Sequence, residues 1–138
     1  MCGGIQYQYK EETVKTYFPN PNAELPILMK NQSIDLIRWG RRKEQQGHLP
    51  QGGWARHESI LQGTWDKYRP VPVKIQVNVF MEKDQDKVSH WFNLEEGQFI
   101  QGLLAHWDDE CRVYVVTVSP PMQHPVHDRW PRVISTLN

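Results

Sequence analysis

A cysteine at the second position of the chain has the most distinctive chemistry in the sequence. If Met1 is removed, Cys2 carries a free α-amine and a thiol on one carbon skeleton. Such a 1,2-aminothiol condenses with an aldehyde: the amine forms a Schiff base, and the thiol adds to it and closes a thiazolidine ring. Gly3 and Gly4 follow and let other backbone or a ligand come close. Position alone leaves open that Cys2 is an incidental residue beside the start codon.

A second set of reactive side chains is the triplet His127-Asp128-Arg129, which follows a proline-rich segment. The prolines predict an extended backbone, on which His127 and Arg129 point to the same side. An imidazole moves protons near neutral pH, and a guanidinium grips phosphate with two parallel hydrogen bonds. A partly buried histidine beside a surface ion pair is the alternative interpretation.

Glu82 ends the most regular strand pattern in the chain, which runs over residues 71–82. Valines and an isoleucine form one face of this expected strand, and Glu82 falls on the other face with Phe80. A carboxylate in apolar surroundings can act as a general acid or base. Because Lys83 and Asp84 follow directly, a solvated hairpin end is the alternative.

The elements that must position these residues are mostly strands, because apolar and polar residues alternate over most of the chain. A short helix is predicted over 55–61, an irregular piece over 64–68, and a polar loop over 40–53. We therefore expect a single α+β domain over residues 1–138, predominantly β, with a mixed or antiparallel sheet or a barrel-like core. The predicted strands cover residues 5–9, 25–29, 33–39, 71–82, 88–94, 98–107, 112–118 and 132–134.

Charge and hydropathy exclude several classes of protein. Lys and Arg total 16 and Asp and Glu total 16, so the formal net charge is zero and no global field attracts nucleic acid or an anionic membrane. No apolar stretch is long enough to span a membrane, and the N-terminus does not have the pattern of a signal peptide. We expect a cytoplasmic, monomeric protein without a membrane partner.

Cysteine usage and the known binding motifs add little further chemistry. Cys2 and Cys111 are too few for a disulfide framework. His124 and His127 have a spacing seen in metal sites, with Cys111 as a third candidate ligand, but no second cluster completes a four-ligand set. No phosphate-binding loop or dinucleotide fingerprint is present, so neither a metal nor a cofactor is expected.

Several short motifs occur in order along the chain: Met1-Cys2-Gly3, Trp39-Gly40, Ala55-Arg56-x-Glu58-Ser59, Phe80-x-Glu82, Val115-Val116-Thr117 and His127-Asp128-Arg129-x-Pro131. Each is weak alone. As an ordered set with a cysteine at position 2, they resemble the SOS-response-associated peptidase (SRAP) family of abasic-site processing proteins. The resemblance spans nearly the whole chain and identifies it as a short, divergent member.

The resemblance implies a protein of the DNA damage (SOS) response that binds single-stranded DNA at abasic sites. Cys2, after removal of Met1, would form a thiazolidine crosslink with the ring-opened sugar. Glu82 and His127 match the residues that move protons in this reaction. The matching DNA contacts are the phosphate-binding Arg56 and Arg129, Trp39 as a base-stacking group, and the neighbouring Arg41 and Trp54. Bound to DNA, the protein would be associated with the nucleoid.

The chain also departs from the family pattern. Trp54 stands where the family usually has an asparagine that positions the cysteine, and Gly4 stands in place of an arginine that contacts phosphate. These departures favour one alternative, a degenerate single-stranded DNA-binding protein without crosslinking activity. The family name suggests another, a self-processing thiol peptidase that uses Cys2 and His127. Whether the chain is an enzyme of the peptidase, hydrolase or lyase kind is therefore open at this stage.

Overall fold

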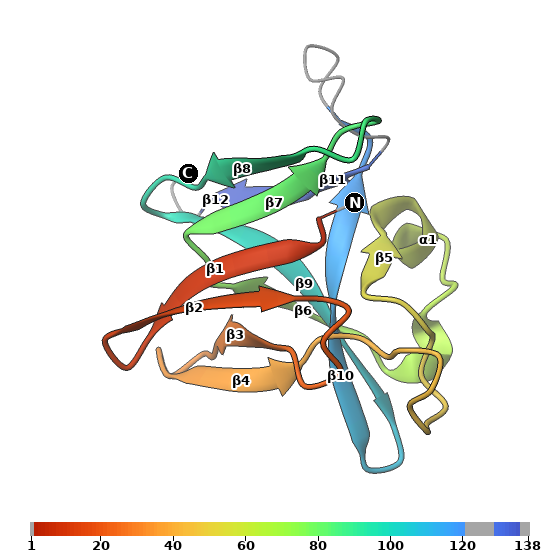
Figure 1. Cartoon of the computed structure of the whole chain (residues 1–138). Helices are drawn as coiled ribbons and strands as arrows, with labels where there is room; N and C mark the ends of the chain where they lie inside the picture. Colours follow the sequence, from red (N-terminus) through yellow and green to blue (C-terminus); the bar gives the residue numbers. More distant parts are fainter. Residues whose placement is uncertain (1, 121–128, 136–138) are drawn as a thin grey trace.

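The computed structural model describes residues 2–120 and 129–135, and most of them lie in strands (Figure 1). This arrangement confirms the predicted predominantly β, α+β fold. The helical elements are the short α1 (His57–Leu61) and a single 3-10 turn, η1 (Asp66–Tyr68). The strands are β1 (Gly4–Tyr9), β2 (Glu12–Tyr17), β3 (Glu24–Leu28), β4 (Ile34–Arg38), β5 (Trp54–Arg56), β6 (Val71–Ile75), β7 (Val79–Lys83), β8 (Ser89–Asn93), β9 (Gln98–Trp107), β10 (Glu110–Val118), β11 (Trp130–Pro131) and β12 (Val133–Ser135).

The strands form two sheets, one smaller and one larger. The four-stranded sheet has the order β2-β1-β7-β8 and is antiparallel throughout. The eight-stranded sheet has the order β11-β10-β9-β6-β3-β4, with β12 on β9 and β5 on β10. β5 is parallel to β10, so this sheet is mixed. Each strand order is open in the described residues, which favours the mixed sheet over the barrel-like alternative.

The predicted long strand over residues 71–82 is wrong as a single element, because it is divided between the two sheets. β6 pairs with β9 and β3 in the larger sheet, whereas β7 pairs with β1 and β8 in the smaller one. The N–H of Gln76 still donates to Pro26 of β3, but the N–H of Asn78 donates to Gln6 of β1. Alternating residues indicate an extended backbone but not which neighbours it pairs with.

Three further elements differ from the expectation. β2 and β11 were not predicted, and β5 includes residues 55 and 56, where the helix was expected to begin, so that only His57–Leu61 is helical. Residues 54–56 are extended because they pair with residues 115–117 of β10, a long-range contact that overrides local propensity. No helix in the described ranges is long and apolar enough to cross a membrane.

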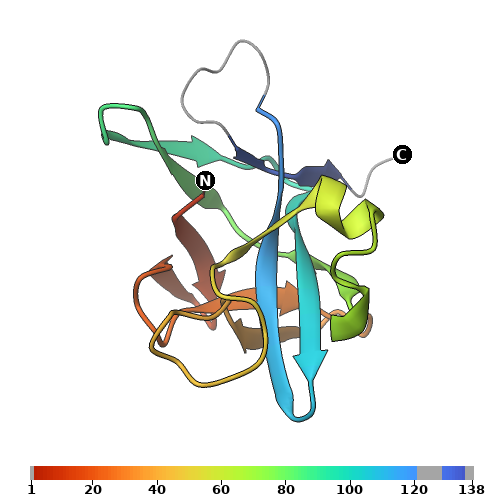
Figure 2. The ribbon, with the colours of Figure 1, turned by 90° about the vertical axis from the view of Figure 1, so that its right-hand side faces the viewer.

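β10 connects two groups of core residues on its opposite faces. Val113 and Val115 point into the cluster between the two sheets, and Tyr114 and Val116 point into a second cluster. This division follows from the alternation of side chains along a strand. The second cluster also holds Trp65, and Figure 2 shows α1 and β5 lying beside β9 and β10 on this side. The site described next lies where β5, β1 and β7 approach one another.

Candidate functional site

The chain segment that enters β1 holds Cys2 in a fixed position. The indole Nε1 of Trp54 in β5 donates to the carbonyl oxygen of Cys2 at 2.6 Å, and the N–H of Gly3 donates to the carbonyl of Met81 in β7 at 3.2 Å. The thiol of Cys2 lies 3.6 Å from the carbonyl oxygen of Gly4. Cys2 is fully buried. A side-chain donor from β5 and a backbone acceptor from β7 therefore orient the residue predicted to be the nucleophile.

Glu82 in β7 and Cys2 just before β1 lie close together. Gly4 pairs with Met81 across β1 and β7, and one further step of this register brings Glu82 opposite Gly3. Its side chain is 0% exposed, so the solvated hairpin end is excluded. Burial raises the pKa of the Cys2 thiol well above its usual range, and the Glu82 carboxylate raises that pKa further. The thiol is consequently protonated at neutral pH.

Trp54 belongs to a group of aromatic rings behind the cysteine. Its ring packs against Phe18 with centroids 4.8 Å apart and against Trp39 with centroids 6.3 Å apart. The guanidinium of Arg42 lies 4.0 Å from the centroid of Phe18. The sequence suggested Arg42 as a phosphate contact and did not place Arg42 or Phe18 beside Trp54, because nothing local shows that residues so far apart share one cluster. The ring of Trp54 is therefore held in place by packing as well as by its hydrogen bond.

A small hollow lies beside Trp54, and of the rings of Trp54, Phe18 and Trp39 only that of Trp54 lines it. Trp54 and Arg56 line it, and it has a volume of about 320 Å³. Its other lining residues are Pro50, Ser59, Thr64, Trp65, Lys67 and Tyr68. Aromatic rings and exposed cations in one hollow are suited to stack a base and hold a phosphate of a single strand. Trp54 thus contacts Cys2 through its indole nitrogen and borders this hollow as well.

Arg129, predicted to contact DNA phosphate, is engaged inside the protein. It is 5% exposed, and its guanidinium forms two hydrogen bonds with the Glu58 carboxylate, at 3.0 and 2.9 Å. It also donates to the carbonyl and hydroxyl oxygens of Thr117. The bidentate geometry expected for phosphate is thus made with a carboxylate of α1. Hydrogen bonding from Arg129 lowers the pKa of Glu58 to about 2.

Two other predicted DNA contacts have structural roles in the loop over residues 40–53. Trp39 is fully buried, and its Nε1 donates to the carbonyl of Gly53, so the base-stacking role expected of it is not supported. Arg41 donates to the carbonyl oxygens of Leu49 and Gln45, each at 2.6 Å, and so closes the loop. The guanidinium of Arg41, which suggested a contact with DNA, thus forms hydrogen bonds within the protein.

The candidate metal ligands do not form a metal site in the described residues. His127 and His124 lie outside the described residues. Cys111 is exposed on β10 and is a free thiol. Within residues 2–120 and 129–135, no three His, Cys, Asp or Glu side chains are grouped so as to hold a metal ion.

Comparisons of this chain with protein-family models, with curated proteins and with solved structures found no match. The site itself consists of a buried cysteine near the start of the chain, a buried carboxylate beside it, and an aromatic and basic hollow that is lined by Trp54, the residue bonded to the cysteine backbone.

Proposed function

We propose that this chain is an abasic-site processing protein of the SRAP kind, which binds single-stranded DNA and captures an abasic site through Cys2 after Met1 has been removed. The observation that carries the proposal is the placement of the buried Cys2 beside the buried Glu82, with Trp54 holding the cysteine backbone. A nucleophile and a proton-transfer group in one buried site are the minimum for this chemistry.

The reaction is a condensation with loss of one water. The α-amine of Cys2 attacks the aldehyde carbon of the ring-opened sugar, and the resulting carbinolamine expels its hydroxyl as water to give an imine. The thiol then adds to the imine carbon, and its proton passes to the imine nitrogen as the thiazolidine ring closes. Glu82 is the group that carries protons in these steps, since its carboxylate has the largest effect of any charged group on the pKa of the thiol.

The raised pKa of the Cys2 thiol fits this reaction better than peptide hydrolysis. In ring closure the amine attacks the aldehyde first. The protonated thiol adds to the imine afterwards, and its proton passes to the imine nitrogen. A thiol peptidase instead needs a thiolate as its attacking group, which burial and the carboxylate of Glu82 disfavour. The self-processing peptidase is accordingly the weaker alternative.

The buried position of Cys2 also bears on the choice of substrate. A nucleotide that has lost its base is smaller and more flexible than an intact one, so it can reach a group that lies below the surface. The hollow beside Trp54, with Arg56 and Lys67 at its border, would hold a neighbouring nucleotide. Because the net charge is zero, only a few phosphate contacts contribute, and the affinity should fall only gently with salt.

A degenerate DNA-binding protein without crosslinking activity is the second candidate. It is favoured by the internal ion pair of Arg129 with Glu58 and by the burial of Trp39, which take two expected DNA contacts out of reach. This candidate predicts binding to intact single strands that weakens as salt is added, and no covalent product.

Intact-protein mass spectrometry decides between the candidates. The purified chain is measured alone and after incubation with a single-stranded oligonucleotide that carries one abasic site. Loss of Met1 and a gain equal to the oligonucleotide minus one water are expected for the wild type, and no gain for Cys2→Ala. An adduct that persists in Cys2→Ala contradicts the proposal, and loss of Met1 without any adduct supports the DNA-binding candidate.

A further inference from the structure

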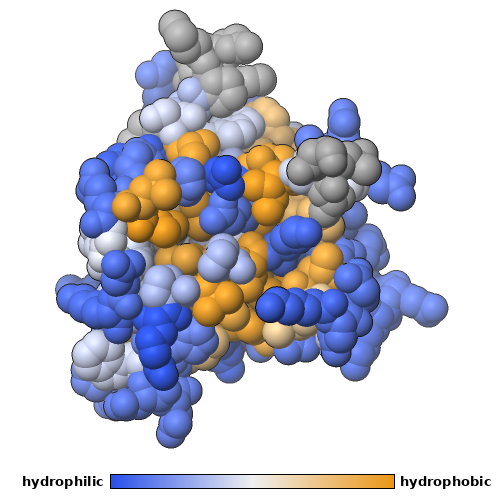
Figure 3. All heavy atoms as spheres, turned by 180° about the vertical axis from the view of Figure 1, so that it is seen from behind, coloured by the Kyte–Doolittle hydropathy of each residue, from blue (hydrophilic) through white to orange (hydrophobic). Residues whose placement is uncertain are grey.

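A groove separate from the Cys2 site lies on the opposite side of the molecule. It has a volume of about 940 Å³ and is bordered by the turn between β3 and β4 and by strands β6, β9 and β12. Seen from behind, apolar side chains gather in the middle of this face and hydrophilic ones surround them (Figure 3). None of the residues that line the groove takes part in the site around Cys2.

The floor of the groove is apolar and open to solvent. It is formed by Leu28, Val73, Leu104 and Ile134, with Val71 at its edge 45% exposed. Sites for small molecules usually enclose most of their ligand. An open floor of this kind instead fits a segment of a larger partner, which covers apolar surface from one side only.

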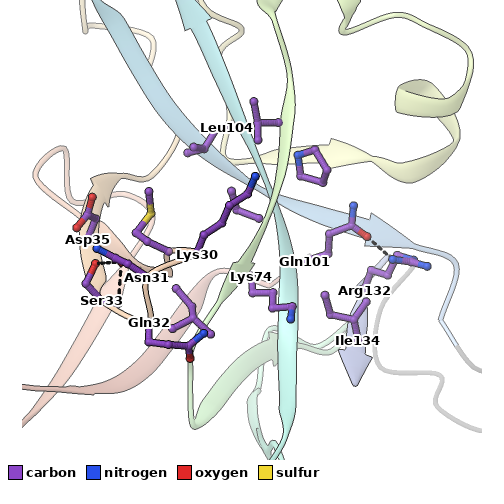
Figure 4. Close-up of a pocket in the computed structure, with 15 residues that line it drawn as sticks. Lys30, Asn31, Gln32, Ser33, Asp35, Lys74, Gln101, Leu104, Arg132 and Ile134 are labelled. Carbon is purple, nitrogen blue, oxygen red and sulfur yellow. Dashed lines mark hydrogen bonds between the residues drawn. The ribbon is translucent and has the colours of Figure 1, made fainter. Parts of the chain in front are cut away.

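The border of the groove carries an excess of positive charge. Lys30, Lys74 and Arg132 line it, against Asp35 as the one acidic lining residue in the described ranges. Figure 4 shows these cations spread across the groove rather than gathered at one end. In the described part of the chain none of the three is in an ion pair with a carboxylate. The protein as a whole is neutral, so this face is locally positive.

The contacts of these cations keep them at the border. The ammonium of Lys74 lies 5.5 Å from the centroid of the Phe99 ring, and Arg132 donates to the side-chain oxygen of Gln101. Both contacts leave hydrogen-bond donors for an incoming carboxylate, because an ammonium has three and a guanidinium five. The groove therefore offers apolar contact below and charge-assisted hydrogen bonds around it.

β6 limits the way in which a partner can bind. β9 pairs with all of β6, whereas β3 pairs only with its last two residues, so the outer edge of residues 71–73 faces the groove. The N–H of Gln76 points toward β3. Because the backbone N–H groups of a strand alternate in direction, an N–H at position 72 would point to the same side. That position is Pro72, which has no N–H to donate. Addition of a partner strand is thereby discouraged, and side-chain contacts must carry the binding.

We propose that this groove binds a partner protein through a short acidic segment that also carries apolar side chains. Apolar residues of the segment would cover the floor, and its carboxylates would pair with Lys30, Lys74 and Arg132. A single strand of nucleic acid fits less well, since no aromatic ring is among the described lining residues to stack its bases. The inference does not depend on the chemistry of Cys2.

Fluorescence polarisation with a labelled peptide tests the proposal. The probe has a central leucine-phenylalanine pair flanked by aspartates, and the control probe has asparagine for every aspartate. The acidic probe should bind the wild type, and Lys30→Glu and Lys74→Glu should each weaken that binding about tenfold. Lys43→Glu removes the same charge from an exposed site outside the groove and should change the affinity less than about twofold.

Circular dichroism and thermal melting show whether both variants fold. If Lys74→Glu does not fold, Lys30→Glu is the decisive variant, because Lys30 is exposed in a turn. Equal binding of the two probes, or unchanged binding in both variants, overturns the proposal. Displacement of the probe by single-stranded DNA, with DNA binding lost in the same variants, would assign the groove to nucleic acid instead. Self-association lost in Lys74→Glu, without probe binding, would assign it to a second copy.

Discussion

The indole nitrogen of Trp54 donates a hydrogen bond of 2.6 Å to the carbonyl oxygen of Cys2. This contact links β5, and through it the parallel pairing with β10, to the segment that enters β1. An indole can donate one hydrogen bond and accept none, and this bond needs only a donor. Trp54 is therefore able to position the cysteine backbone although the resemblance led us to expect an asparagine there.

Replacing Trp54 with phenylalanine should separate this hydrogen bond from ring packing. Trp54→Phe keeps an aromatic ring against Phe18 but leaves the buried Cys2 carbonyl without its donor, at a cost of about 1–3 kcal/mol. Under the proposed function, crosslinking to abasic DNA should become about two- to tenfold slower, measured by gel shift under denaturing conditions. Trp107→Phe, at a surface tryptophan far along the sheet, is the matched control and should crosslink at the wild-type rate.

Replacing Glu82 with glutamine should make the Cys2 thiol easier to ionise but should slow crosslinking. The Glu82 carboxylate raises the pKa of Cys2, so Glu82→Gln should lower that pKa. Titration of thiolate absorbance in a Cys111→Ser background measures it. Crosslinking should nevertheless slow, because the proton carrier is lost. A lower thiol pKa together with faster crosslinking would show that Glu82 serves only to keep the thiol protonated.

The ion pair of Glu58 with Arg129 should make stability depend on acid. The folded-state pKa of Glu58 is about 2, below its ordinary value of 4.5. Its contribution is therefore fully present above pH 4.5 and is lost as the pH falls from there toward 2. Glu58→Gln should melt at a lower temperature than the wild type at neutral pH, and the difference should shrink on acidification. A difference that stays constant with pH contradicts a role for this ionisation.

Gly102 in β9 should tolerate no side chain. A Cβ there would lie 2.9 Å from the Ile75 side chain and 3.1 Å from that of Val113, in the cluster between the sheets. Gly102→Ala should destabilise the fold by about 1–3 kcal/mol through overpacking, measured by urea unfolding. Ser89→Ala, at the exposed start of β8, should change the unfolding free energy by less than about 0.5 kcal/mol.

Much of the strand content was predictable because it depends on local alternation. β1, β3, β4, β8, β9, β10 and β12 were each predicted within a residue or two, since period-two patterns report a half-buried extended backbone directly. The division of residues 71–82 was not predictable, because the pattern is the same whichever strand lies alongside. β5 was missed for the same reason, as its partner is some sixty residues further along the chain.

The candidate site divides in the same way. The sequence by itself determined that a cysteine, a glutamate and an Ala-Arg motif are present, and the ordered resemblance singled them out. Only the tertiary structure decided that Cys2 and Glu82 share one buried site, that Trp54 bonds to the cysteine backbone, and that Glu58 engages Arg129. Residue types set which chemistry is possible, whereas burial and the choice of hydrogen-bond partner depend on long-range packing that no local pattern encodes.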